Sequence, residues 1–398
     1  MINYNQVNII HKLFGFTVFY LLLFNVLGLM TFEPYRELGR ETSLWVLYLS
    51  VFIVLYDILI NRGINRNFKS IYIGFGLLIT SYTITHIFNK NFTEDTTLLI
   101  LFLTFCFILS ITKINWIPNH FRIMGITSII ILTLFFFDWI TEGYPTYRFT
   151  SFFTNSNVTG LFLYFLLFFQ ITSIKFFSRK VTFTLIVLSI FINLFLIYTT
   201  TTRSVLLSIA IILFSWLLVK YSQKLYYYLF HVVISFNFIF IISYTYLSNS
   251  EYANSLNELS QKWFGKSFFS GREEIWGSAI EYGLNSPWIG HFVGVTPKEY
   301  VNGSNYVHTH NQYVQVFLES GLFGVLAFII LLTIFWKFYH LNINSHIVQW
   351  SSFFFLGMLI HQNTSMTFYY QYPVMGLIHW MIVSIGISVA LKKYRLLS

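Results

Sequence analysis

The sequence predicts an all-α, polytopic integral membrane protein with about twelve transmembrane helices and one large external loop. Hydrophobic residues make up 56% of the 398 positions and charged residues only 10%, which is more apolar surface than a soluble chain of this length needs. Apolar runs of about 18–20 residues recur, and they are long enough to cross a hydrocarbon core as helices. These runs are continuously apolar rather than alternating, which favours helices over a β-barrel.

The expected spans follow one another along the chain and are joined mostly by short loops. Because no internal repeat or low-complexity run is visible, residues 1–398 are expected to form a single membrane domain. The first run lacks a small-residue cleavage pattern, so we expect it to remain as an uncleaved span. In order, the spans are expected at 11–30, 43–60, 70–88, 96–112, 121–140, 157–177, 181–198, 203–220, 225–247, 319–339, 347–363 and 374–391.

Charged residues are divided unequally between the two sides of the predicted bundle. The side that holds both termini carries 15 of the 24 basic residues, whereas 14 of the 15 acidic residues lie on the other side. The positive-inside rule therefore places both termini in the cytoplasm. The net charge of +9 reflects this bias and gives no reason to expect nucleic-acid binding, because no basic cluster lies on a soluble module. Cys106 lies within a span, so neither a disulfide nor a cysteine metal site is expected.

The loop at 248–310, between the ninth and tenth spans, is much longer than the others, and we expect it to carry part of a functional site. Its aromatic content argues against disorder. Apolar residues at helical spacing predict a short amphipathic helix near 271–284. Asn285-Ser286-Pro287 should end that helix.

Three arginines on the external side are candidates for binding phosphate. Arg203 opens the eighth span, Arg272 begins the predicted loop helix, and Arg148 precedes the sixth span. The planar guanidinium suits bidentate binding of phosphate oxygens, and a phosphate at the start of the loop helix would also gain from the helix dipole. The simpler alternatives are snorkelling of Arg203, an ion pair of Arg272 with Glu273 or Glu274, and a plain interfacial role for Arg148.

His310 is the candidate general base. An imidazole has an ordinary pKa near 6.5, so it can accept a proton at neutral pH. The neighbouring Asn311 could orient His310 or a sugar through its amide. The helix that follows is apolar, and Gly321 and Gly324 are expected to let it pack closely against a neighbour.

A metal site is the alternative for this histidine. His308 and His310 could ligate a cation only with further ligands such as His291 or Glu319. No motif spacing demands those ligands, so we expect neither a metal nor another cofactor.

Short motifs stand in a fixed order between residues 148 and 324. They comprise Arg148 with Asn155 and Asn157, Arg203 with Leu207, Gly271-Arg272 with Trp276, Pro287 with Gly290, and His310-Asn311 followed after nine residues by Gly321 and Gly324. In this order the chain resembles the O-antigen ligase and polymerase superfamily of polytopic glycosyltransferases. One element departs from the family pattern, because Ser156 replaces the proline of Asn-Pro-Asn.

The resemblance implies a metal-independent, inverting transferase of the GT-C type in a bacterial plasma (inner) membrane. It would act at the outer face on glycans carried by undecaprenyl pyrophosphate as donor and acceptor. Arg203, Arg272 and Arg148 would bind the pyrophosphate, and His310 would deprotonate the acceptor hydroxyl. Pyrophosphate is already a good leaving group that needs cationic stabilisation, and the sequence has no Asp-x-Asp motif. Supporting positions would be Asn311, Glu319, Gly321, Gly324, His308 and Asn157.

Three functions are consistent with this pattern. We expect a polymerase that joins repeat units into O-antigen, capsular or exopolysaccharide, working beside a flippase and a chain-length regulator. A ligase that moves the finished glycan to a lipid or protein acceptor would use the same motifs. A flippase or transporter is a third class, but repeats are absent and the reactive residues gather on one side.

Overall fold

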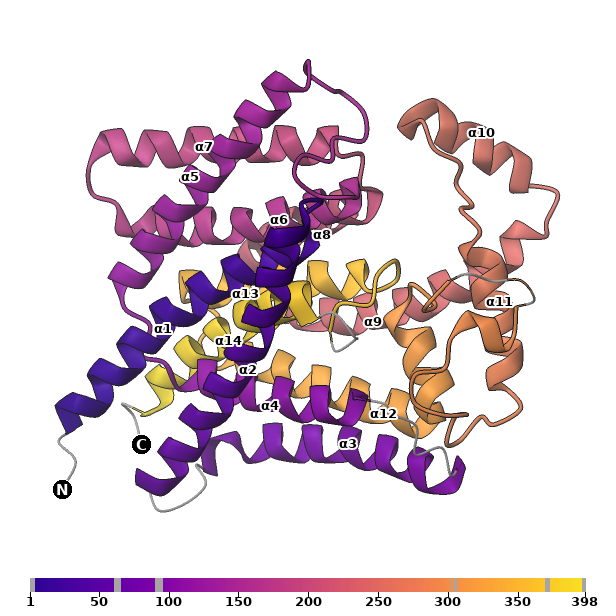
Figure 1. Cartoon of the computed structure of the whole chain (residues 1–398), viewed down its shortest axis with the longest axis horizontal. Helices are drawn as coiled ribbons and strands as arrows, with labels where there is room; N and C mark the ends of the chain where they lie inside the picture. The colour runs from indigo at the N-terminus through magenta and orange to yellow at the C-terminus, as the bar shows by residue number, and fades with distance from the viewer. Residues whose placement is uncertain are drawn as a thin grey trace.

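The computed structural model describes residues 4–60, 66–89, 96–301, 303, 306–368 and 373–395. Within these ranges the chain forms α-helices and short 3-10 helices and contains no β-strand (Figure 1). The all-α prediction is therefore confirmed. Nine of the described helices are long and apolar enough to cross a membrane, and two shorter apolar helices accompany them.

Twelve helices coincide with the predicted runs. They are α1 (Tyr4–Val26), α2 (Glu33–Ile60), α3 (Lys69–Asn89), α4 (Thr97–Lys113), α5 (Pro118–Thr141), α6 (Ser156–Ser173), α7 (Lys180–Thr199), α8 (Arg203–Tyr221), α9 (Gln223–Ser248), α12 (Gln312–His340), α13 (His346–His361) and α14 (Pro373–Arg395). This agreement follows from the length that a hydrocarbon core imposes on an apolar helix.

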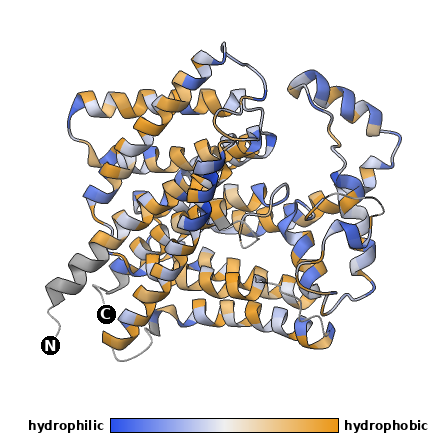
Figure 2. Ribbon diagram, in the orientation of Figure 1, coloured by the Kyte–Doolittle hydropathy of each residue, from blue (hydrophilic) through white to orange (hydrophobic). Residues whose placement is uncertain are grey.

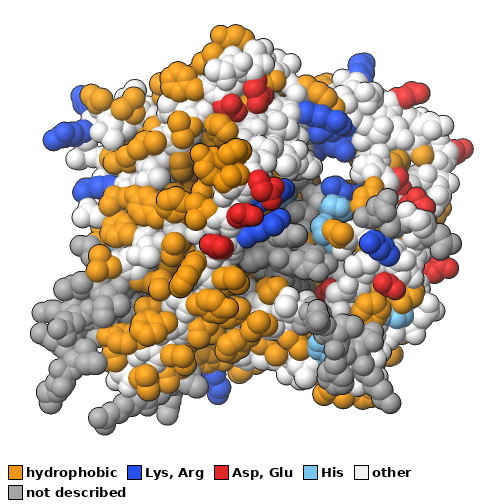
Figure 3. Space-filling view, in the orientation of Figure 1, with side chains coloured by type: hydrophobic (Ala, Val, Ile, Leu, Met, Phe, Trp, Pro, Cys, Tyr) orange, Lys and Arg blue, Asp and Glu red, His pale blue; other side chains and the backbone are white. Residues whose placement is uncertain are grey.

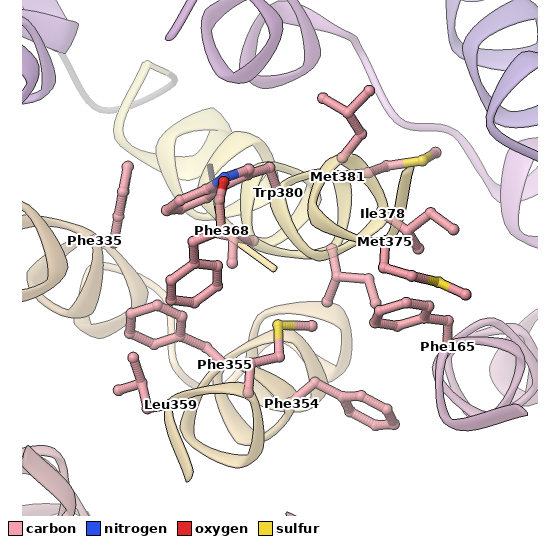
Figure 4. Close-up of a cluster of buried hydrophobic side chains, with 14 of the residues drawn as sticks. Phe165, Phe335, Phe354, Phe355, Leu359, Phe368, Met375, Ile378, Trp380 and Met381 are labelled. Atoms are coloured by element: carbon pink, nitrogen blue, oxygen red, sulfur yellow. The ribbon is translucent and has the colours of Figure 1, made fainter. Parts of the chain in front are cut away.

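The helices α6, α13 and α14 form the centre of the bundle. In the most apolar window of α14, 94% of residues are buried, compared with 28% for α5, α7 and α8. Figure 4 shows buried apolar side chains from these three helices in one cluster, with Phe165 from α6, Phe354 from α13 and Met381 from α14. The outer helices instead expose many large apolar side chains, as expected of surfaces that face lipid.

Asp57 is the acidic residue that the charge pattern leaves on the basic side of the bundle. It forms an ion pair of 2.9 Å with Lys113, and the two side chains are only 8% and 10% exposed. The pair joins α2 to α4, two helices that pack along each other. A charge deep in the bundle is thus neutralised by a partner, as the low dielectric requires.

A polar lobe stands at one end of the bundle, away from the first turn of α1 and the last turn of α14 (Figures 1 and 2). It contains α10 (Ala253–Phe264) and α11 (Arg272–Gly283). The second of these confirms the helix predicted near 271–284, and it packs on α9 and α12. The first was not predicted, although Leu256, Leu259 and Trp263 have helical spacing.

Candidate active site

The helix that follows His310 is broken at Gly321. Gly321 has φ 62° and ψ −161°, so α12 consists of two helical segments that meet at a kink. From the sequence we expected this helix to pack closely against a neighbour at Gly321, and it does so, although the break in the helix was not predicted. A non-glycine residue would be strained at this φ, and its Cβ would collide with the backbone of Trp288.

The turn at 287–291 supplies the hydrogen bonds that the kink removes from α12. The Leu322 N–H donates to the Pro287 carbonyl over 2.8 Å, and the His291 N–H donates to the Leu318 carbonyl over 2.9 Å. Gly290, at φ 72°, lets this turn approach, because a Cβ there would lie 2.5 Å from the Ser320 nitrogen. The two glycine motifs therefore form one interlocked unit that fixes the start of α12.

Gly324 lies one turn beyond the kink. A Cβ at this position would overlap the Ser320 side chain, whose hydroxyl donates to the Val316 carbonyl over 3.0 Å. Its role is therefore local, within α12, rather than in a contact between two helices.

Asn311 caps α12 through its side-chain amide. Its Oδ1 accepts hydrogen bonds from the Tyr313 and Val314 N–H groups at 3.0 and 3.1 Å. Its Nδ2 donates to the Asn363 carbonyl over 3.2 Å. This cap satisfies two backbone donors that would otherwise lack partners, and it was not predicted from the sequence.

His310 is held in an unusual backbone conformation between two anchored neighbours. Its φ is 57°, in the left-handed region. The Trp276 indole of α11 donates to the Thr309 carbonyl over 2.8 Å on one side, and the Asn311 cap fixes the other side. The ring centroids of His310 and His308 are 4.1 Å apart. The ring nitrogens of His310 form no hydrogen bond with any described residue, so they are available to a substrate.

Both histidines are neutral at physiological pH. Burial, and after it the neighbouring His308 and Arg272, lower the pKa of His310 to about 3. Burial and then Arg272 lower the pKa of His308 to about 4. A neutral imidazole is the form that accepts a proton.

Arg272 is the first residue of α11, and it lies close enough to His308 and His310 for its positive charge to lower the pKa of both. Its pKa is lowered by burial and by the positive charge of Arg203. Glu273 does not form an ion pair with it, because that carboxylate accepts the N–H groups of Ser270 and Gly271 at 3.2 and 3.1 Å. Among the described residues no carboxylate pairs with Arg272, so the ion-pair alternative does not hold there.

Arg203 points into the external lobe rather than towards the headgroup region. Its Nη1 donates to the Ser260 hydroxyl over 3.0 Å and to the Ser267 carbonyl over 2.9 Å. The turn before it is fixed on α6, because the Thr202 hydroxyl donates to the Ser156 carbonyl over 3.1 Å. Nε and Nη2 of Arg203 form no hydrogen bond within the described part of the chain.

Lys266 is a fourth cation at this site, and the sequence interpretation missed it. Its Nζ donates to the Thr201 carbonyl over 3.1 Å. Burial lowers its pKa to about 8, and the charges of Arg148 and Arg203 act in the same direction. The sequence did contain a signal for Lys266, because this lysine lies on the external side, where the positive-inside rule makes basic residues uncommon.

Arg148 borders this group from the loop between α5 and α6, and Asn157 follows in α6 itself. Arg148 is exposed, has φ 54°, and its guanidinium carbon lies 5.3 Å from the centre of the Tyr147 ring. The Phe149 N–H donates to the Thr199 carbonyl over 3.2 Å, which ties the loop to the turn before Arg203. Asn157 is exposed in the first turn of α6.

Four cations thus form one cationic cluster, which we define as Arg148, Arg203, Lys266 and Arg272. None of them forms an ion pair with a carboxylate of the described residues. Figure 3 shows basic and histidine side chains gathered around a hollow between the bundle and the lobe. Uncompensated positive charge beside a neutral imidazole suits a polyanionic substrate that reacts with a weakly acidic group.

Comparison with known proteins is consistent with this chemistry. A family model described as O-Antigen ligase matches residues 188–329. This match, over about a third of the chain, supports a relationship to the O-antigen ligase and polymerase superfamily. The match contains His310 and three members of the cationic cluster, whereas Arg148 and Asn157 lie outside it. No curated protein matches the chain.

The match supports a membrane-embedded enzyme of the O-antigen ligase or polymerase type, a class whose substrates are lipid-linked glycans. Gly321 and Gly324 of α12 both lie in the matched segment. The turn at 287–291, which forms hydrogen bonds with α12 on both sides of Gly321, also lies in it. The interlocked unit therefore lies within the segment that matches the family model.

Glu319 and His291 both have other partners in the structure. These are the two residues that a metal site at His308 and His310 would have needed as further ligands. Glu319 is fully buried and accepts hydrogen bonds from the Tyr82 hydroxyl at 2.9 Å and the Gln315 amide at 2.9 Å. The His291 ring stacks on Tyr282 with centroids 3.9 Å apart. Within the described ranges, no group of three or more His, Cys, Asp or Glu side chains is arranged to hold a metal ion.

Proposed function

We propose that this protein is a polysaccharide polymerase, which transfers a growing glycan between undecaprenyl-pyrophosphate carriers at the outer face of the bacterial inner membrane. The observation that carries the proposal is the unpaired cationic cluster beside the neutral His310. A diphosphate-linked donor needs positive charge at the leaving group, and a sugar hydroxyl needs a base.

The donor diphosphate would be held by Arg203 and Arg272, with Arg148 at the exposed edge. Arg203 keeps Nε and Nη2 for the substrate while Ser260 and Ser267 hold Nη1. Charge that develops on the phosphate oxygen as the glycosidic bond breaks is then stabilised without reorganisation of the site. On this proposal the arginines supply the charge, so the reaction needs no metal ion.

His310 would act as the base for the acceptor. The acceptor hydroxyl attacks the anomeric carbon from the face opposite the diphosphate, the bond to the phosphate oxygen breaks, and the hydroxyl proton passes to His310. A single displacement of this kind inverts the configuration. The pKa of about 3 in the free site is low for a base, but a diphosphate on Arg272 would offset the charge that helps to lower it. Donor binding would therefore raise the pKa of His310 and activate it.

The remaining positions would support the geometry. Asn311 and Gly321 fix the end of the helix that presents His310, and Gly324 shapes the first turns after the kink. Glu319 anchors α12 to α3 through Tyr82. His308 contacts His310 directly through its ring. Asn157, exposed beside the cluster, could contact the donor sugar.

A ligase is the second candidate, because the family model that matches carries the description O-Antigen ligase. The two reactions share the donor and the chemistry and differ only in the acceptor. An assay of the purified full-length protein with lipid-linked repeat units and excess chelator distinguishes the two reactions. A ladder of longer lipid-linked glycans supports the polymerase. Transfer only after a second lipid or protein acceptor is added supports the ligase, and no transfer in either case contradicts the proposal.

A further inference from the structure

Lys266 lies where three separate parts of the chain meet. It follows α10, and its Nζ donates over 3.1 Å to the carbonyl of Thr201 in the turn between α7 and α8. The loop between α5 and α6 contributes the Tyr147 ring, whose centre is 5.9 Å from the Lys266 nitrogen. The ammonium group is therefore partly buried among the elements that carry Arg148 and Arg203.

Tyr147 holds this arrangement together. Its hydroxyl donates to the Gly265 carbonyl over 2.8 Å, and its ring faces both Arg148 and Lys266. Gly265 has φ 63°, and a Cβ there would lie 3.0 Å from the tyrosine ring. The residue before Lys266 must therefore be small and left-handed, which fixes the direction of the lysine.

Ser260 connects Lys266 to Arg203. Its hydroxyl accepts from Arg203 Nη1 over 3.0 Å and donates to the Lys266 carbonyl over 2.7 Å. The fold thus brings two cations together, and Arg148 lies 5.3 Å from the centre of the Tyr147 ring that also contacts Lys266. The groups that face Lys266 are Arg148, Arg203 and the Tyr147 ring, and no described carboxylate pairs with it.

We propose that Lys266 is a further binding residue for the diphosphate of the lipid-linked donor, acting beside Arg203, and that Tyr147 positions it. This inference rests on the proposed function. Like charges held together without an acid are unfavourable in the free protein, and a diphosphate relieves that repulsion. The lysine keeps two N–H donors beyond its bond to Thr201, enough for an oxygen of each phosphate.

The test measures binding of inorganic pyrophosphate to the full-length protein in nanodiscs by calorimetry. Lys266→Met should weaken binding by roughly tenfold or more, the loss expected for a charge-assisted hydrogen bond. Lys262→Met is the matched control, because that exposed lysine on α10 lies outside the cluster and should leave affinity unchanged. Wild-type affinity in Lys266→Met would overturn the inference.

A pH series distinguishes binding from a merely structural role. The lowered pKa of about 8 means that Lys266 loses its charge above that pH, so wild-type affinity should fall there. Lys266→Arg stays charged, so the ratio of its affinity to that of the wild type should rise above pH 8. A ratio that stays constant with pH would overturn the inference, even if Lys266→Met does not fold.

Pyrophosphate binding requires no glycan transfer, so the two proposals fail separately. A wild-type protein that binds pyrophosphate through Lys266 but transfers no glycan supports this inference and contradicts the proposed reaction. A protein that transfers glycan with the same donor KM in wild type and Lys266→Met supports the reaction and contradicts the role of Lys266.

Discussion

The two ends of the helical bundle differ in whether their buried charged side chains form ion pairs. At one end Asp57 and Lys113 form an ion pair of 2.9 Å between α2 and α4. At the other end Arg203, Lys266 and Arg272 are partly buried, and none pairs with a described carboxylate. Folding alone favours paired charges in a low dielectric, as the first end shows. Unpaired like charges at the second end indicate that this region is shaped for an anionic ligand.

The backbone shows the same contrast. Among the described non-glycine residues, those with positive φ are all on the side of the external lobe: Tyr144, Arg148, Ser151, Thr201 and His310. Each such conformation costs about 1–3 kcal/mol and persists only where the surroundings enforce it. The central helices α6, α13 and α14 have regular backbones and close packing instead. Strain is thus confined to the end that carries the cationic cluster.

The largest expected effect concerns His310. His310→Ala should lower the rate of glycan transfer by roughly 10²–10⁴-fold, the usual loss of a general base. Pyrophosphate affinity should change little, because the cationic cluster is intact. His308→Ala is the matched control and should be milder. Transfer by His310→Ala at the wild-type rate would remove the proposed base.

The arginines come next. Arg203→Lys keeps the positive charge but loses the planar guanidinium, together with its two Nη1 hydrogen bonds to Ser260 and Ser267. We therefore expect kcat/KM for the lipid-linked donor to fall by roughly 10-fold or more. Arg272→Ala should raise the donor KM in the same assay. Arg36→Ala serves as the control, because this half-buried arginine at the start of α2 already forms an ion pair with Glu33. Normal donor kinetics in both cluster variants would show that the unpaired charge has another purpose.

The interlocked glycines provide a test of stability. Gly290→Ala should destabilise the protein by at least about 1–3 kcal/mol, because alanine is strained at φ 72° and its Cβ meets the backbone of Glu319 and Ser320. Thermal unfolding in detergent measures this change. Gly277→Ala in α11 is the matched control, since nothing lies within 4 Å of a Cβ there. Equal melting temperatures for the two variants would contradict the interlock.

The pH profile of transfer should reflect the lowered pKa values. His310 becomes protonated only as pH falls towards about 3, so kcat/KM for the donor should stay level from pH 7.5 to about 5. Above pH 8 it should decline as Lys266 loses its charge, and Lys266→Arg should remove that decline. An acid limb centred near pH 6.5 would mean that His310 is not buried as described.

The comparison between the two ends also assumes that they lie on opposite sides of the membrane. In a Cys106→Ser background, a cysteine introduced by Ser270→Cys should react with an impermeant thiol reagent in intact cells. A cysteine at the exposed Ser178 should react only after permeabilisation. The reverse pattern would invert the proposed orientation and place the cluster in the cytoplasm.

The sequence by itself determined the helices, because an apolar run of about 20 residues in lipid must satisfy its own backbone hydrogen bonds. It also located the start of α11 and the residues Arg203, Arg272 and His310 through their motifs. It did not predict two supporting details, the break of α12 at Gly321 and the helix cap formed by Asn311.

Only the tertiary structure decided which of these residues act together. Lys266 joins the cluster because Tyr147 and Ser260, far apart in sequence, both contact its turn. The kink at Gly321 exists because the turn at Pro287 supplies replacement hydrogen bonds to α12. The lowered pKa of His310 arises from burial and from charges on separate elements. Each of these is a long-range contact, and local pattern carries no information about which distant segment fills the neighbouring space.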